Sequence, residues 1–247
     1  MRGLWRLTWV EMKLFLREPM AAFFTLAFPL MMLFLFGSIY GNEPTPFFGG
    51  FGSVDVAVPA YTALIIATTG LVSLTITMAS YRERGVLRRL RATPLRPQTV
   101  LTAQVLVLFL MTALGMALLI VAGKTVYGLR FVGDPFSVLG AFVLSSLSFF
   151  ALGFVLAGLL PTARTAQIVA MVLFYPMIFL SGATIPLESL PETIRRYAQA
   201  LPLTHVVTLL RGLWFGEGWG AHLKEVVLLA GLLATGVIVS AKTFRWE

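Results

Sequence analysis

Cysteine is missing from this 247-residue chain, so disulfide bonds, thiolate metal sites and cysteine nucleophiles are all excluded. Charge is also scarce, because Asp, Glu, Lys and Arg make up 12% of the residues, about half of what soluble domains carry. The hydrophobic share is 58% and the mean hydropathy is +0.87. So large an apolar share excludes a disordered chain, and it is more than one water-soluble domain could bury.

Long uncharged runs are the most informative feature of the sequence. Six runs of 16 to 29 residues contain no Asp, Glu, Lys or Arg: 19–42, 56–81, 97–123, 135–163, 165–187 and 226–241. A membrane-spanning helix needs about 20 apolar residues, so five runs suffice directly, and Lys224 and Lys242 can extend the sixth toward the headgroups. The sequence predicts an all-α membrane protein with one transmembrane domain, 1–247. Its six transmembrane helices are expected at about 20–41, 58–80, 99–123, 136–160, 165–184 and 223–241.

Basic residues indicate the orientation of these spans. Six spans place both termini on one side, and that side carries 13 of the 19 Lys and Arg residues, including six in the loop 81–96. Because basic residues are retained on the cytoplasmic side, both termini are predicted to be cytoplasmic in a multi-pass protein of the plasma (inner) membrane. The net charge of +8 is then explained mostly by membrane insertion, and no nucleic-acid partner is expected.

The predicted spans contain no Asp, Glu, His, Lys or Arg in their cores. Proton-driven carriers and intramembrane proteases place such residues inside the membrane, where they are costly and functional. Their absence argues against a proton-driven carrier, although a sodium site built from backbone carbonyls stays open. If the protein moves a solute uphill, the energy is expected to come from outside the bilayer.

Hydroxyl residues recur along the second span. Thr62, Thr69, Ser73 and Thr77, followed by Ser80, fall within an arc of about 80° on a regular helix. One interpretation is a polar stripe that faces a translocation path. The alternative is that these hydroxyls bond back to the preceding helical turn or join neighbouring helices.

Two segments that are predicted to be cytoplasmic could lie on the membrane surface or against a partner protein. Residues 2–18 project as an amphipathic helix with a basic stripe that fits anionic lipid, while Glu11 and Glu18 interrupt the opposite face and indicate contact with protein. The segment 81–91 projects as a short helix with an apolar ridge and basic edges, which can dock into a cleft on a partner. The alternatives are a plain membrane-surface anchor for the first segment and topological charge for the second.

An irregular external stretch separates the fifth and sixth spans. Ser181-Gly182 and Pro186 break the fifth helix, and a short helix is expected over 191–200. The apolar segment 203–215 is too short to span, so an external re-entrant hairpin is predicted between helices 5 and 6. It could serve as an outer gate or as a cover over the bundle.

Several motifs in this order resemble one known family. Leu16-Arg17-Glu18-Pro19 precedes the first span, and Glu83-Arg84-Gly85 with Leu90-Arg91-Ala92-Thr93-Pro94 follows the second. Leu180-Ser181-Gly182, the run 186–191 and Leu201-Pro202-Leu203-Thr204 mark the external hairpin. Together they resemble the type-2 ABC transporter permeases, an export family that includes daunorubicin-resistance and nodulation-oligosaccharide permeases.

The resemblance implies the following partners and roles. Such permeases are not themselves catalytic and bind no cofactor or metal; they pair with a separate ABC ATPase subunit that holds ATP and Mg, and with a second permease, here expected as a homodimer. The residues implied in ATPase coupling are Glu83, Arg84, Gly85, Leu87, Arg88 and Arg91. The interface helix is implied to use Glu11, Arg17 and Glu18, with Arg17 as a partner for Glu83.

Three functions are compared. The leading hypothesis is the permease subunit of an ATP-binding-cassette exporter for a hydrophobic drug, lipid or lipid-linked saccharide. The alternative is a non-transporting membrane assembly or receptor subunit, which needs the surface helices but no path. A lipid-modifying intramembrane enzyme is the least favoured, because His205, His222 and Asp134 lie outside the spans and are scattered in the sequence.

Overall fold

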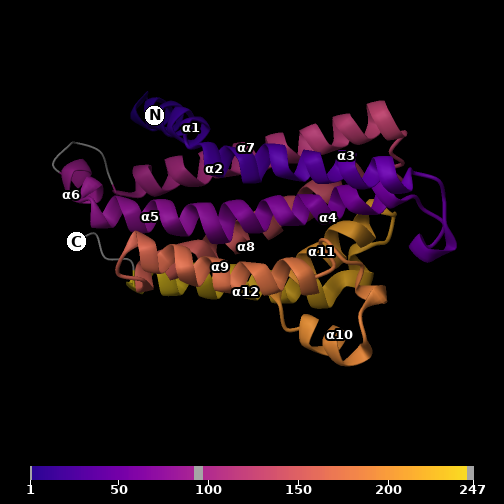
Figure 1. Cartoon of the computed structure of the whole chain (residues 1–247). Helices are drawn as coiled ribbons and strands as arrows, with labels where there is room; N and C mark the ends of the chain where they lie inside the picture. Colours follow the sequence, from indigo (N-terminus) through magenta and orange to yellow (C-terminus); the bar gives the residue numbers. More distant parts are fainter. Residues whose placement is uncertain (1, 92–96, 244–247) are drawn as a thin grey trace.

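The computed structural model of the chain describes residues 2–91 and 97–243, and every regular element in those ranges is helical. Six of its helices are long and apolar enough to cross a membrane, as predicted: Pro19–Tyr40, Ser53–Glu83, Thr99–Tyr127, Pro135–Leu159, Ala163–Leu180 and Trp219–Lys242. The spans lie lengthwise in one bundle, and successive spans alternate in direction (Figure 1).

The spans are assembled from labelled elements. The first is α2 (Pro19–Ala22), a π-helical turn η1 (Phe23–Ala27) and α3 (Phe28–Tyr40); the second is α4 (Ser53–Ala67), a π-helical turn η3 (Thr68–Ser73) and α5 (Leu74–Glu83). The others are α7 (Pro97–Tyr127), α8 (Pro135–Leu159), α9 (Ala163–Leu180) and α12 (Leu223–Thr243). The shorter elements are α1 (Arg2–Arg17), η2 (Pro46–Phe48), α6 (Val86–Arg91), η4 (Leu187–Ser189), α10 (Glu192–Ala198), α11 (Pro202–Trp214) and η5 (Trp219–His222).

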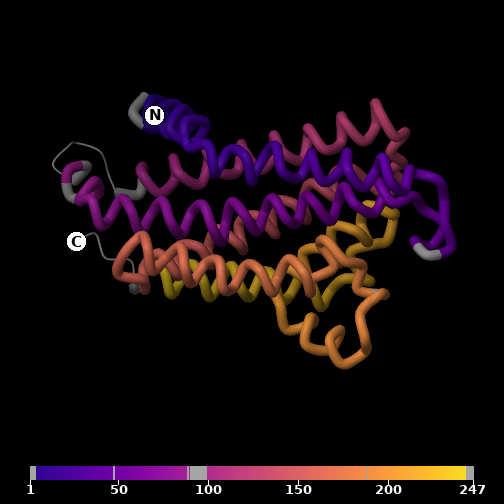
Figure 2. The backbone as a smooth tube through the Cα atoms, in the orientation of Figure 1, coloured from indigo at the N-terminus to yellow at the C-terminus, as the bar shows by residue number. Residues whose placement is uncertain are grey.

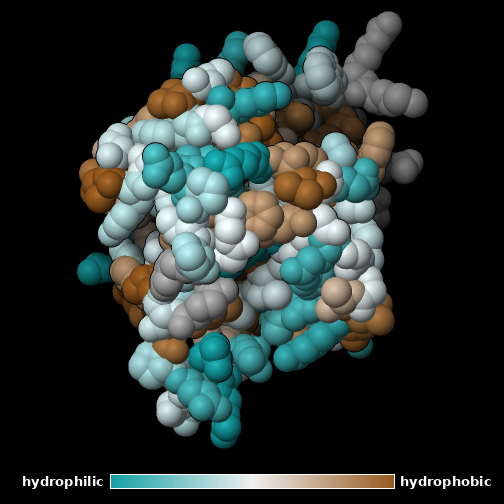
Figure 3. All heavy atoms as spheres, turned by 90° about the vertical axis from the view of Figure 1, so that its right-hand side faces the viewer, coloured by the Kyte–Doolittle hydropathy of each residue, from teal (hydrophilic) through white to brown (hydrophobic). Residues whose placement is uncertain are grey.

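The two ends of the bundle differ. One end, here called the terminal end, carries α1, α6 and the turn between α8 and α9 (Figure 2). The opposite end, here called the loop end, carries the first connection with η2, and α10 and α11 (Figure 1). Viewed from outside, the loop end shows many hydrophilic residues (Figure 3).

The second span is the centre of the molecule. In the apolar 18-residue stretch of this span, 83% is buried, compared with 22% in the corresponding stretches of the first and fifth spans and 11% in that of the sixth. α4 packs on α3, α7 and α11, while α5 packs on α8 and α9. The peripheral spans therefore leave apolar side chains exposed, for example Leu35, Val172 and Val237, as expected for surfaces that meet lipid or another membrane protein.

The central span crosses α8 at a contact between two glycines. A Cβ built on Gly153 would lie 2.1 Å from the Gly70 carbonyl oxygen, and one built on Gly70 would lie 2.7 Å from Phe149 Cβ. Only residues without side chains permit two helices to approach this closely. Thr75 Oγ1 adds a hydrogen bond to the Gly153 carbonyl, at 3.3 Å, beside this crossing.

The segment 203–215, predicted to be external, is helical. It forms α11, which is almost entirely buried and packs on α4, α8 and α12. The short helix expected before it is α10, over Glu192–Ala198. The depth of α11 in a bilayer, and so the re-entrant character of the hairpin, stays a prediction.

Helix ends near the membrane surface are capped by side chains. Asp134 accepts the Ser137 backbone N–H at 2.7 Å and begins α8, and Thr162 accepts the Thr165 N–H at 3.1 Å and begins α9. The hydrogen bonds from Ser137 lower the pKa of Asp134 below its ordinary value. Both residue types satisfy N–H groups that have no partner inside the helix.

Replacing Gly153 with alanine is expected to destabilise the protein by about 1–3 kcal/mol, because the new methyl group collides with the backbone at Gly70. Thermal unfolding in detergent measures the effect. The control is Gly231→Ala in α12, where a Cβ meets nothing within 4 Å, and this variant should unfold at or slightly above the wild-type temperature. Equal melting temperatures for the two variants would contradict the close crossing.

Candidate functional site

The residues predicted to couple the protein to a partner gather at the terminal end. α5 ends at Glu83, and Gly85 turns the chain in a left-handed conformation with φ of 65° before α6 begins. Leu87 is buried and anchors α6, whereas Arg84 is exposed. Of the other predicted residues in this segment, Arg88 and Arg91 belong to the backbone of α6, and their side chains lie outside the described part.

α1 is tied to this end by a buried carboxylate. Glu11 is 7% exposed, and the Tyr81 hydroxyl donates a hydrogen bond of 2.7 Å to its Oε2. Burial raises the pKa of the Glu11 carboxyl above its ordinary value of 4.5, and the hydrogen bond from Tyr81 offsets part of that rise. Glu11 therefore contacts protein, as its position on the apolar face of the predicted helix indicated.

The other predicted interface residues are placed differently. Arg17 and Glu18 are exposed at the junction of α1 and α2. The ion pair expected between Glu83 and Arg17 is not among the contacts of the described residues. Instead, Glu83 Oε2 accepts the Ala163 backbone N–H at 2.8 Å, at the first residue of α9. The carboxylate meets a helix N-terminus, where a negative charge is favourable.

Arg82 makes the complementary contact. Its Nη1 donates to the Gly158 carbonyl at 3.1 Å, and its Nη2 donates to the Leu160 carbonyl, so the guanidinium caps the last turn of α8. The sequence places Arg82 on a basic edge of the predicted helix 81–91 or, alternatively, counts it as a topological charge, and neither interpretation indicates a cap. No local motif indicates this role, because the two carbonyls lie more than 75 residues away in the chain.

The hydroxyl stripe of the second span divides into two groups. Thr62 and Thr69 are buried, and each donates to a carbonyl of the preceding turn, Thr62 to Val58 at 2.8 Å and Thr69 to Ile65 at 2.9 Å. Ser73 and Thr77 are half-buried and reach the surface of the chain. A π-helical turn over Thr68–Ser73 explains the division, because it changes the helical period and rotates the following residues relative to the preceding ones.

A buried aspartate at the loop end escaped sequence reasoning. Asp55 is fully buried, and its carboxylate accepts hydrogen bonds from Asn42 Nδ2 at 2.9 Å, Gly52 N at 3.0 Å and Arg130 N at 2.8 Å. It fastens the first connection to the start of α4 and to the chain between α7 and α8. The predicted second span is set by the uncharged run 56–81, which begins one residue after Asp55. Asp55 is therefore placed outside the predicted helix, whereas α4 begins at Ser53 and includes it.

Both histidines lie near one glutamate at the loop end. His205 Nδ1 lies 3.9 Å from Glu225 Oε1, and His222 Nδ1 lies 3.8 Å from Glu225 Oε2. The two imidazoles are therefore close together in space, although they are scattered in the sequence. His222 Nε2 also lies 2.9 Å from Glu217 Oε2, as an ion-pair contact without the alignment of a hydrogen bond.

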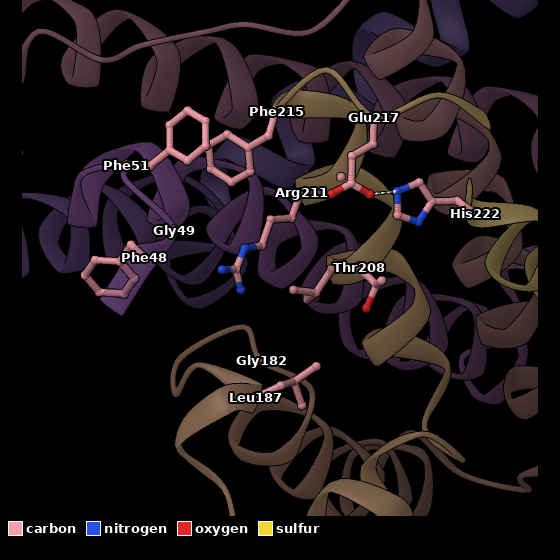
Figure 4. A pocket seen from close by; sticks show the side chains of 12 residues that line it. Phe48, Gly49, Phe51, Gly182, Leu187, Thr208, Arg211, Phe215, Glu217 and His222 are labelled. Carbon is pink, nitrogen blue, oxygen red and sulfur yellow. Dashed lines mark ion pairs between the residues drawn. The ribbon is translucent and has the colours of Figure 1, made fainter. Parts of the chain in front are cut away.

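Two cavities open at the loop end. One has a volume of about 450 Å³; the Phe51 and Phe215 rings stack on one side of it with centroids 4.0 Å apart, and Arg211 extends from α11 toward Phe48 (Figure 4). The other, of about 480 Å³, is mostly apolar and lies between α3, α4 and the chain after α9. Phe48 and Gly182 line both. Each volume is within the range of small-molecule pockets.

The chain is similar to membrane transport proteins. The profile described as ABC-2 type transporter matches residues 2–215. A daunorubicin resistance ABC transporter permease protein of Streptomyces coeruleorubidus is 24% identical over 245 residues, which are 96% of this chain and 84% of that protein. An inner membrane transport permease of Escherichia coli (strain K12) is 25% identical over 201 residues, 79% of this chain and 51% of that protein.

A shorter match is to nodulation protein J of Rhizobium leguminosarum bv. viciae, which is 31% identical over 96 residues, 39% of this chain and 36% of that protein. Several of the curated relatives are thus matched over only about a third to a half of their own length, between 36% and 51%.

The attachment of α1 is expected to weaken as the pH rises. A carboxyl whose pKa is raised in the folded state binds its proton more tightly there, so its contribution to stability is greatest at low pH and is lost as the pH rises through and above its ordinary value of 4.5. Hydrogen-exchange protection of α1, corrected for intrinsic rates, should fall in the wild type as the pH rises above 4.5. Glu11→Gln should remove this dependence.

The matched variant is Tyr81→Phe, which keeps the ring and removes the donor. Leaving the buried Glu11 carboxylate without this bond should reduce the protection of α1 by about 1–3 kcal/mol at neutral pH. If the pH profile of Glu11→Gln matched that of the wild type, the buried carboxyl would not control the attachment.

Proposed function

The chain belongs to the ABC-2 type transporter family, and from that premise we propose that it is the permease subunit of an exporter driven by a separate ATPase. The family membership and the long apolar helices establish a membrane subunit of a transporter. The coupling to ATP, the direction of transport and the substrate are the proposed parts.

The observation that carries the proposal is the short helix α6 at the terminal end. It is held by the buried Leu87 and presents the exposed Arg89, and the exposed Arg84 lies just before it at the end of the central span. A helix of this kind can insert into a cleft of a soluble partner, and a displacement there would reach α5 directly. Glu83, Arg84, Gly85, Leu87, Arg88 and Arg91 are proposed as the ATPase-coupling segment, with ATP and Mg held by the partner.

The interior of the bundle supports an external source of energy. Asp55, the buried carboxylate of the central span, is occupied by three hydrogen bonds from Asn42 and the backbone. A group used for proton coupling must instead exchange its proton with a pathway. We therefore assign Asp55 to structure and the driving force to the partner subunit.

A second permease is proposed to cover exposed apolar surface. The first, fifth and sixth spans bury little of their area within one chain. Two copies that share such faces would form a dimer in the plasma (inner) membrane, with both termini in the cytoplasm and lipid around the remaining faces. α1, with Glu11 inward and Arg17 and Glu18 exposed, would lie at the cytoplasmic membrane surface as the interface helix.

The substrate is proposed to be hydrophobic: a drug, a lipid or a lipid-linked saccharide. The relative from Streptomyces coeruleorubidus is named for daunorubicin resistance, and the relative from Rhizobium leguminosarum bv. viciae is named for nodulation. Ser73 and Thr77, like Ser80 after them, are half-buried members of the hydroxyl stripe, and Ser73 and Thr77 are proposed to face the path. Thr62 and Thr69 belong to the same stripe in sequence but are enclosed by neighbouring helices.

The alternative function is a non-transporting assembly or receptor subunit. It shares α1 and α6 with the transporter but requires no path for a substrate. The loop-end cavities favour the transporter, because an assembly factor has no need for cavities of small-molecule size.

Reversing a charge on the coupling segment is expected to weaken the complex with the ATPase. Arg84→Glu should reduce the ATPase that co-purifies with the chain by about tenfold, equivalent to about 1.4 kcal/mol, since an exposed cation near the contact becomes an anion. The control is Arg196→Glu in α10, an exposed arginine at the loop end, which should bind as the wild type does. Failure of the wild-type chain to bind any ATPase encoded beside it would contradict the proposed function.

Accessibility of the hydroxyl stripe tests the path, and the cysteine-free chain permits single-cysteine variants without further substitutions. Cysteines at Ser73 and Thr77 should react with a maleimide in membrane vesicles, and daunorubicin, used as the probe, should slow the reaction severalfold. Cysteines at Thr62 and Thr69 should react at least tenfold more slowly, because both positions are buried. Equal reactivity at all four positions would contradict a path beside Ser73 and Thr77.

A further inference from the structure

Consecutive charged residues at the end of α5 hold two different helix termini. Arg82 donates to the carbonyls of Gly158 and Leu160 at the C-terminal end of α8, and Glu83 accepts the N–H of Ala163 at the N-terminal end of α9. The connection between these helices is only residues 160–162. Two consecutive residues therefore form hydrogen bonds on both sides of a three-residue turn.

Each charge has the sign that its helix terminus favours. The C-terminal end of a helix carries partial negative charge from unpaired carbonyls, and the N-terminal end carries partial positive charge from unpaired N–H groups. Arg82 meets the first and Glu83 meets the second. Exchanging the two residues would place each charge at the wrong terminus, so the order Arg-Glu matters as well as the presence of charge.

The same dipeptide directly precedes the proposed coupling helix. Residues 84 and 85 separate Glu83 from α6, and Tyr81, one residue before Arg82, bonds to Glu11 of α1. α6 itself packs on α5 and α7. The side chains of Arg82 and Glu83 are thus the polar connection, in the described part of the chain, between the base of α6 and the α8–α9 turn.

We propose that Arg82 and Glu83 act as positioning residues, forming a clamp that makes the α8–α9 turn move together with α6. This inference rests on the proposed function, in which a partner ATPase displaces α6. A displacement of α6 reaches α5 through the backbone. The clamp adds a second route, because the side chains of Arg82 and Glu83 carry the displacement to the fourth and fifth spans.

A purely structural role makes a different prediction. Glu83 is exposed and Arg82 is half-buried, and contacts of charges that water reaches contribute little to the free energy of folding because water screens them. Removing the clamp should therefore leave the melting temperature nearly unchanged while it uncouples two segments. The distinguishing measurement is how far a displacement spreads from α6, and overall stability does not report on it.

The experiment follows hydrogen–deuterium exchange in the complex of the chain with its ATPase, with and without Mg and a non-hydrolysable ATP analogue. In the wild type, the nucleotide should change exchange both in α6 and in residues 160–166. In Arg82→Met, which keeps much of the side-chain volume and removes the donors, α6 should still respond and the response of 160–166 should fall at least fivefold. Arg82→Lys, which keeps the charge but loses the fork of donors, should give an intermediate response.

Arg164→Met is the matched control, because Arg164 is an exposed arginine on the first turn of α9 and is not part of the clamp. It should respond as the wild type does. A wild-type response of residues 160–166 in Arg82→Met would overturn the clamp, as would a fall in melting temperature in that variant as large as the one expected for Gly153→Ala.

A second measurement uses the isolated chain and does not depend on the ATPase. In Glu83→Ala, the Ala163 amide loses its acceptor and should exchange at least tenfold faster than in the wild type. Unchanged exchange at Ala163 would overturn the clamp, whereas absence of any ATPase complex with the wild-type chain would overturn the proposed function alone.

Discussion

Helix ends leave backbone groups without intrahelical partners, and at several places in this bundle a charged or hydroxyl side chain supplies the partner. Asp134 and Thr162 begin α8 and α9, Asp55 fastens the start of the central span, and Arg82 and Glu83 serve the turn between α8 and α9. Asp134 and Thr162 act within the helices that they begin. Asp55, Arg82 and Glu83 bond to other segments of the chain, so for these three the requirement for hydrogen bonds also sets which segments are mechanically connected.

The class of fold could be predicted from the sequence. The length of helix needed to cross a bilayer is set by the bilayer's thickness, and the uncharged runs of that length predicted all six long helices. It also predicted a short helix after the second span and protein contact at Glu11. For the hydroxyl stripe the sequence left open a path or bonds back to the preceding turn. Thr62 and Thr69 make such bonds, and the π turn over Thr68–Ser73 alters the regular helical period from which the stripe was derived. The partner of Glu83 and the role of Arg82 depend on residues about 80 positions away, which no local pattern encodes.

The two ends of the molecule are built for different partners. At the terminal end, α1 and α6 combine buried anchors, Glu11 and Leu87, with exposed charges, which suits contact with a soluble protein and with headgroups. At the loop end, aromatic rings, Arg211 and the pair formed by Glu217 and His222 surround open space, which suits small molecules (Figure 4).

The contact between Gly70 and Gly153 has a mechanical consequence. A Cβ on Gly153 would lie 2.1 Å from the Gly70 carbonyl oxygen, so backbone atoms of the second and fourth spans meet there without a side chain between them. Closely packed atoms transmit a displacement without slack, so the two spans are expected to shift together at this crossing.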